Sequence, residues 1–156
     1  MIFGLTGHQK LPDSVADYAR SRLREMRFAE DVIGVCSLAA GADQLFAEVV
    51  LDLGGRLWAV IPANDYETTF DDPGDLDKFE RLVTDAERVE RLNFAKPSEQ
   101  AFYAAGLRVV DLCDKLYALW DGKKARGLGG TGDIVTYARE QGKPTDVLWL
   151  DGVARD

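Results

Sequence analysis

Gly127-Leu128-Gly129-Gly130-Thr131-Gly132-Asp133 is the stretch of this chain that decides its fold. It follows the apolar run Leu116 to Trp120 and precedes the helix-like run Ile134 to Gln141. A strand, a glycine loop and a helix start form the arrangement with which a Rossmann-like fold binds phosphate. Glycine lets the backbone approach an anion closely, and the unpaired N–H groups of the first helical turn point at it. The stretch therefore predicts an α/β fold with a phosphate-binding loop.

Apolar runs of strand length alternate with helical periodicity along the rest of the chain. The expected strands are 2–6, 32–37, 57–61, 89–92, 116–120 and 146–150. The expected helices are 15–26, 41–53, 76–86, 97–113 and 133–141. Strands separated by single helices favour a parallel sheet that is covered on both faces. The sequence thus predicts one three-layer Rossmann-like domain over residues 1–156, with a mostly parallel sheet of about six strands.

Composition and charge limit the classes of function. The net charge of -8 argues against DNA as a partner, because a phosphate backbone binds a basic surface. A local basic patch of Lys123, Lys124 and Arg126 nevertheless leads into the glycine loop. Cys36 and Cys113 lie in apolar segments, as expected for reduced core residues of a cytoplasmic protein. No apolar run approaches the roughly 20 residues of a membrane span, so we expect no membrane association.

Four strand ends are candidate binding positions, because ligands of parallel sheets bind at the carboxyl ends of the strands. These ends follow Thr6, Ser37, Ile61 and Trp120. At the first junction the candidate ligand-binding residues are Thr6, Gly7 and His8. The alternative for this junction is a plain turn with solvated side chains.

The second junction offers Ser37, Gly41, Ala42 and Asp43 as ligand-binding residues. Small residues at a helix start allow close backbone approach, and the helix N-terminus favours an anion. Asp43 is either a ligand contact or an ordinary acid of the first helical turn. The third junction gives only a weak signal, in which Asn64 and Tyr66 would line a base or sugar pocket.

The fourth junction contains the glycine loop. Its candidate ligand-binding residues are Asp121, Gly122, Arg126, Gly129, Gly130, Thr131 and Gly132. Asp133 is either a helix cap or a catalytic acid. The loop is not a Walker A motif, because no Gly-Lys-Ser/Thr closes it. The acidic stretch 71–77 lacks the spacing of an EF-hand, so we expect no metal site.

The order of these motifs resembles the SLOG superfamily, which joins Smf/DprA proteins, Lonely Guy phosphoribohydrolases and small Rossmannoid proteins. The resemblance rests on Thr6-Gly7-His8, the run 37–43, Trp120-Asp121-Gly122 and the run 129–133. It implies a pocket for a nucleotide-type ligand, with the phosphate on Gly129 to Gly132, and a homodimer. It also implies that Glu99 and Tyr103, one helical turn apart, face the cleft.

The chain departs from the Lonely Guy enzymes at both catalytic positions. Aligning Gly130-Thr131 with their Gly-Thr places Ile134 where they carry a glutamate, with Asp133 one residue earlier. Counting back from Asp114 places Ala105 where they carry an arginine, and Arg108 lies one helical turn away. Without these charges a glycosidic cleavage loses its acid–base and oxocarbenium-stabilising groups.

We therefore expect a protein that binds a nucleoside phosphate, a nucleotide sugar or an ADP-ribose-like ligand, for example as a sensor, and that requires no other cofactor. The alternative is a nucleoside 5′-monophosphate phosphoribohydrolase that releases free base. In that case Asp133 and Glu99 would be its catalytic carboxylates.

Overall fold

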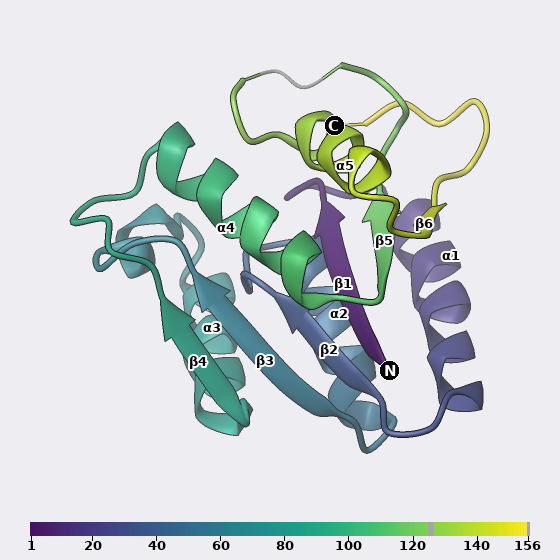
Figure 1. Ribbon diagram of the computed structural model, residues 1–156, viewed down its shortest axis with the longest axis horizontal. Helices are drawn as coiled ribbons and strands as arrows, with labels where there is room; N and C mark the ends of the chain where they lie inside the picture. Colours follow the sequence, from purple (N-terminus) through teal and green to yellow (C-terminus); the bar gives the residue numbers. More distant parts are fainter. Residues whose placement is uncertain (125–126, 156) are drawn as a thin grey trace.

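The computed structural model describes residues 1–124 and 127–155, and it contains a six-stranded sheet between two layers of helices (Figure 1). The strands are β1 (Ile2–Gly7), β2 (Ile33–Cys36), β3 (Arg56–Ile61), β4 (Arg88–Arg91), β5 (Lys115–Leu119) and β6 (Thr145–Val147). Their order is β4-β3-β2-β1-β5-β6, and all neighbouring strands are parallel. The predicted α/β class and the six-stranded sheet are confirmed.

Five α-helices and two short 3-10 turns connect the strands. They are α1 (Asp13–Leu23), η1 (Arg24–Phe28), α2 (Ala42–Asp52), η2 (Tyr66–Thr69), α3 (Pro73–Asp85), α4 (Glu99–Leu112) and α5 (Thr131–Glu140). Two helix starts carry the side-chain caps that their sequences favour. The Asp72 carboxylate accepts from Gly74 N at 2.7 Å, and the Ser98 hydroxyl accepts from Ala101 N at 3.1 Å.

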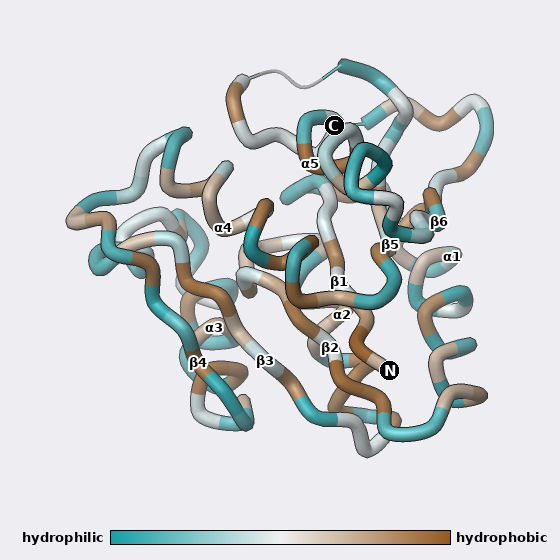
Figure 2. The backbone as a smooth tube through the Cα atoms, in the orientation of Figure 1, coloured by the Kyte–Doolittle hydropathy of each residue, from teal (hydrophilic) through white to brown (hydrophobic). Residues whose placement is uncertain are grey.

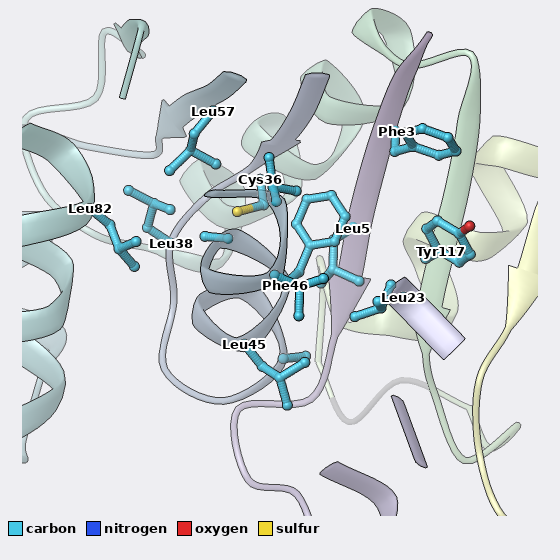
Figure 3. Packing of buried hydrophobic residues seen from close by; sticks show 14 of the residues in the cluster. Phe3, Leu5, Leu23, Cys36, Leu38, Leu45, Phe46, Leu57, Leu82 and Tyr117 are labelled. Carbon is cyan, nitrogen blue, oxygen red and sulfur yellow. The ribbon is translucent and has the colours of Figure 1, made fainter. Parts of the chain in front are cut away.

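Both faces of the sheet are buried, which explains why its strands are continuous apolar runs. Helices α1, α2 and α3 cover one face around a cluster that includes Phe3, Leu5, Phe46 and Tyr117 (Figure 3). Helices α4 and α5 cover the other face, which includes Val35 and other small apolar side chains. Hydrophobic residues follow the central strands, whereas the edge strand β4 is largely hydrophilic (Figure 2).

Most element boundaries differ from the prediction by one to three residues, and two of these differences bear on the site. Helix α5 begins at Thr131, two residues before the expected start, because Gly130 already serves as its N-cap. Strand β6 has only three residues, because the chain leaves the sheet after it and the Trp149 indole N–H donates to Val153 O at 2.7 Å. Among the described residues, no helix has both the length and the apolar character that crossing a bilayer requires.

The strand order reverses between β1 and β5, which are neighbours in the sheet although three strands and four α-helices lie between them in sequence. Their register places Gly7 beside Leu119, so the loops that follow them start side by side. Ligands of such sheets bind outside the carboxyl ends of the strands at this point of reversal. The fold therefore directs attention to the loops after β1 and β5.

Candidate ligand-binding site

A cavity of about 880 Å³ lies at the carboxyl ends of the strands. All four junctions predicted from the sequence contribute to its wall, and so do the starts of α4 and α5. Its volume is within the range of small-molecule sites, roughly 300–1,000 Å³. The predicted residues that line it are Thr6, Gly7, His8, Ser37, Asp43, Tyr66, Glu99, Gly129, Gly130, Thr131 and Gly132.

Other predicted residues lie beside the cavity without forming its wall in the described part of the chain. These are Gly41, Ala42, Asn64, Asp121, Gly122 and Asp133. Arg126 lies outside the described residues. The direct ligand contacts assigned to all these residues stay predictions.

The glycine loop is shaped by the acid that follows it. The Asp133 carboxylate accepts from Gly129 N at 3.1 Å, and Asp133 N donates to Gly130 O at 3.0 Å. The backbone N–H groups of Thr131 and Gly132 have no hydrogen-bond partner among residues 1–124 and 127–155. Both residues line the cavity at the start of α5. The loop thus presents two unpartnered donors and the positive end of a helix dipole to one region.

Close packing against α4 fixes the position of this loop. Gly129 has a φ of +83°, and a Cβ at this position would lie 2.7 Å from Tyr103 N. A Cβ at Gly127 would lie 2.7 Å from a carboxylate oxygen of Glu99. Glu99 lines the cavity, whereas Tyr103 packs against the core beneath α4. Of this pair, only Glu99 forms part of the wall.

His8 joins the first and fourth junctions. Its Nε2 lies 3.4 Å from Asp121 Oδ1 and accepts from Asp121 N at 3.3 Å, and its Nδ1 lies 3.5 Å from Thr131 Oγ1. The residue is 5% exposed, and its ring packs edge-on against Trp149 with centroids 5.4 Å apart. The alternative of a plain turn with a solvated histidine is therefore wrong.

Asp121 remains ionised beside this histidine. Burial alone would raise the pKa of Asp121, but the hydrogen bond from Lys123 N and the neighbouring His8 imidazole lower that pKa below its ordinary value. The Asp121 side chain is 3% exposed, and its Oδ2 has no hydrogen-bond partner in the part of the chain that the structure describes.

The loop of the second junction is held by hydrogen bonds to the carboxylate of its own Asp43. Asp43 Oδ2 accepts from Ser37 N and Ala39 N, each at 3.2 Å. Burial raises the pKa of Asp43 to about 7, although these two hydrogen bonds lower it. Ala42 N donates to His8 O at 3.1 Å, and a Cβ at Gly41 would overlap the carbonyl of Gln9. Asp43 therefore shapes the loop from within, in addition to lining the cavity.

Sequence reasoning missed one part of the cavity wall. Phe70 and Phe102 line it, and both pack edge-on against Tyr66 with ring centroids 5.5 and 6.2 Å apart. Asp71, Asp72 and Asp75 add carboxylates to the wall. Arg155, from the segment after β6, also lines the cavity. The only sequence signal was the aromatic character of positions 66, 70 and 102, which the core explains equally well.

The two positions that carry charge in the Lonely Guy enzymes are apolar and buried in this chain. Ile134 is 2% exposed against Gly106, and Ala105 is 1% exposed. Arg108 donates to Glu90 with its Nε at 2.9 Å. It is not among the described residues that line the cavity.

No protein-family model matches the chain, and no curated protein matches it. Solved structures do. DNA processing protein A from Streptococcus pneumoniae matches with a TM-score of 0.70 at 16% identity over 93% of this chain, which spans 49% of that chain. The Helicobacter pylori protein, whose structure concerns single-stranded DNA binding, matches with a TM-score of 0.73 at 17% identity over 100% of this chain and 68% of that one.

A third match is the molybdenum cofactor carrier protein of Chlamydomonas reinhardtii. Its TM-score is 0.61 at 13% identity, over 94% of this chain and 74% of that one. The likeness in fold thus extends over nearly the whole course of the chain. The protein has the Rossmann-like fold that DNA processing protein A and the molybdenum cofactor carrier proteins share.

Proposed function

We propose that this protein binds a small nucleotide-type ligand, with the phosphate of that ligand at the start of α5. The supporting observation is the pair of unpartnered N–H groups at Thr131 and Gly132, which belong to residues that line the cavity. Helix N-termini of this kind bind phosphate through their N–H groups and the helix dipole. The Thr131 hydroxyl adds a third donor at the same place.

Aromatic and acidic residues elsewhere in the cavity wall suit the rest of such a ligand. Phe70 and Phe102 offer apolar ring surface on which a base stacks. The carboxylates of Asp71 and Asp75 are acceptors for hydroxyl or amino groups of a sugar or base. The ligand that fits such a cavity has a phosphate in one part and an aromatic base or sugar with hydrogen-bond donors in another. A nucleoside phosphate, a nucleotide sugar and an ADP-ribose-like molecule all have this composition.

DNA is a poorer ligand for this cavity. The net charge of -8 and the acidic wall at Asp71, Asp72 and Asp75 repel a chain of phosphates. We therefore place DNA second to a small molecule, although the fold is shared with a protein that binds single-stranded DNA. A fluorescence-anisotropy titration with a labelled oligonucleotide tests this ranking, and tight binding at 150 mM salt would reverse it.

Binding without turnover is favoured over hydrolysis. The Asp133 carboxylate is engaged with Gly129 N, and the positions at Ile134 and Ala105 carry no charge. Glu99 is the single predicted catalytic carboxylate that lines the cavity. A glycosidic cleavage normally uses a pair of acidic groups.

The test is a panel of nucleoside phosphates, nucleotide sugars and ADP-ribose, scored by thermal shift and by release of free base. A ligand at 100 times its Kd adds about 2.7 kcal/mol of stability. We expect a shift with at least one compound and no free base. Absence of any shift would contradict the proposal. Free base that disappears in Glu99→Gln would instead establish the hydrolase, and sedimentation of the same samples measures the predicted homodimer.

A further inference from the structure

The segment after β6 returns to the ligand cavity. It turns back across the end of the molecule that carries the glycine loop and reaches α5 (Figure 1). Trp149 anchors it, because its ring packs against His8 and its indole N–H bonds Val153 O. This anchoring places Arg155 in the wall of the cavity that Gly127 to Gly132 also line.

Among residues 1–124 and 127–155, Arg155 has no hydrogen-bond or ion-pair partner in this position. Its Nε is buried and has no hydrogen-bond partner, and it forms no ion pair within the described part of the chain. Arg91 and Arg108, by contrast, donate to Glu67 and Glu90. A buried donor left unsatisfied is destabilising, so native proteins rarely keep one. The arrangement is explained if a ligand accepts from Arg155.

Two other cationic side chains line the cavity and can act with Arg155 on an anion, although five carboxylates also line it. These cationic side chains are Lys10 and Lys123. Asp121 is close enough for the charge of Arg155 to help keep its carboxylate ionised, although the two side chains form no ion pair. The guanidinium is therefore attracted to this end of the sheet while its buried N–H stays available.

We propose that Arg155 makes the site selective for a terminal phosphate, by donating from Nε to one of its oxygens. This inference rests on the proposed function, because the backbone N–H groups of Thr131 and Gly132 bind the same phosphate. A phosphate monoester presents three terminal oxygens and a charge of about -1.5 to -2 at neutral pH to these N–H groups, to the Thr131 hydroxyl and to Arg155. A phosphate inside a diphosphate bridge has only two free oxygens. Arg155 accordingly favours nucleoside monophosphates over nucleotide sugars and ADP-ribose.

Inorganic phosphate is the probe that tests Arg155 independently of any nucleoside. It is titrated into 15N-labelled protein while the Gly132 N–H and Arg155 Nε–H signals are recorded. We expect both signals to shift with one Kd. Arg155→Gln should weaken this Kd by about 10-fold or more, which is the usual effect of losing a charge-assisted hydrogen bond. Arg155→Lys should weaken it less, and Arg20→Gln, an exposed charge change on α1, should leave it unchanged.

The same variants are then titrated with AMP, adenosine and ADP-ribose by calorimetry. We expect Arg155→Gln to weaken AMP about 10-fold or more while leaving adenosine unchanged. If neither protein binds a nucleotide but phosphate binding requires Arg155, the proposed function fails and the role of Arg155 stands. If AMP binds equally to both proteins, the role of Arg155 is wrong and the proposed function stands. Failure of the unmodified protein to bind phosphate also overturns the role of Arg155.

Discussion

The junctions before α2 and α5 look alike in sequence and differ in what they leave free. Each follows a central strand with small residues and an acid in the first helical turn. Before α2, Ala42 N is bonded to His8 O, and the buried Asp43 carboxylate holds the loop from inside. Before α5, the partly exposed Asp133 carboxylate accepts from Gly129 N. The N–H groups of Thr131 and Gly132 have no partner among the described residues.

The position of the acid is what separates the two junctions. A carboxylate buried at the start of α2 occupies the place where an external anion would bind and repels it when ionised. The Asp133 carboxylate at α5 accepts from Gly129 N. The first N–H groups of the helix are therefore still available to a ligand in the cavity. The same residue pattern therefore forms an internally hydrogen-bonded loop before α2 and a candidate phosphate site before α5.

Gly41→Ala has the largest expected effect, because it disrupts the packing of the loop before α2. Gly41 has a φ of +80°, and a Cβ there would overlap the Gln9 carbonyl. Backbone strain and overpacking together should lower the free energy of unfolding by roughly 3–5 kcal/mol. Gly54→Ala at the other end of α2 is the matched control, since φ is +75° with open space around it. Urea unfolding of both variants measures the difference, and equal losses would show that the loop contact is unimportant.

Asp43→Asn tests how the buried carboxylate contributes to the stability of the loop before α2. The folded-state pKa of about 7 lies above the ordinary value of 3.8, so the folded protein binds the proton more tightly than the unfolded chain. The contribution of Asp43 to stability is therefore complete below pH 4 and is lost as the pH rises to about 7, by roughly 3–4 kcal/mol.

Asn removes this titration while keeping the shape of the side chain. Urea unfolding between pH 4 and pH 8 should show the stability of Asp43→Asn rising relative to that of the unmodified protein. Asp133→Asn, in the first turn of α5, is the matched variant measured in parallel. Parallel profiles for Asp43→Asn and the unmodified protein would contradict the assignment.

Gly129→Ala should damage binding more than stability. A Cβ at Gly129 would lie 2.7 Å from Tyr103 N, but the neighbouring residues Gly127 and Leu128 are exposed, so the loop has room to move away from α4. We expect a loss of about 1–2 kcal/mol in unfolding free energy and of about 10-fold in phosphate affinity. Gly142→Ala, beyond the other end of α5 at φ +69° with open space, is the control. Unchanged phosphate affinity in Gly129→Ala would remove the loop from the site.

The sequence was sufficient for the fold and for the location of the cavity. Apolar runs and helix caps are local signals, and the rule for carboxyl strand ends selected junctions that do meet in one cavity. It was not sufficient to tell the two junctions apart. Whether Ala42 N is free depends on His8 O, a partner in another loop, and no local pattern reports such a contact.

The remaining wall depends on contacts between distant segments. Phe70 and Phe102 come together through Tyr66, and Arg155 reaches the cavity because Trp149 packs on His8. Each is unremarkable in its own stretch of sequence, where aromatic residues indicate core and an arginine indicates surface. The strand order was likewise unpredictable, since pairing β5 with β1 is decided by packing over the whole sheet.

Thr131→Val has the smallest expected effect and tests the candidate phosphate site most directly. The Thr131 hydroxyl lies 3.5 Å from His8 Nδ1, which is long for a hydrogen bond, so its loss should cost at most about 1 kcal/mol of stability. If the hydroxyl donates to the ligand, phosphate affinity should nevertheless fall about 5- to 10-fold, while Thr131→Ser retains it. Thr136→Val is the control, because that hydroxyl bonds Gly132 O on the exposed side of α5. Equal phosphate affinity in both valine variants would show that the Thr131 hydroxyl does not bind the phosphate. The two junctions would then differ only in whether their backbone N–H groups are available to a ligand.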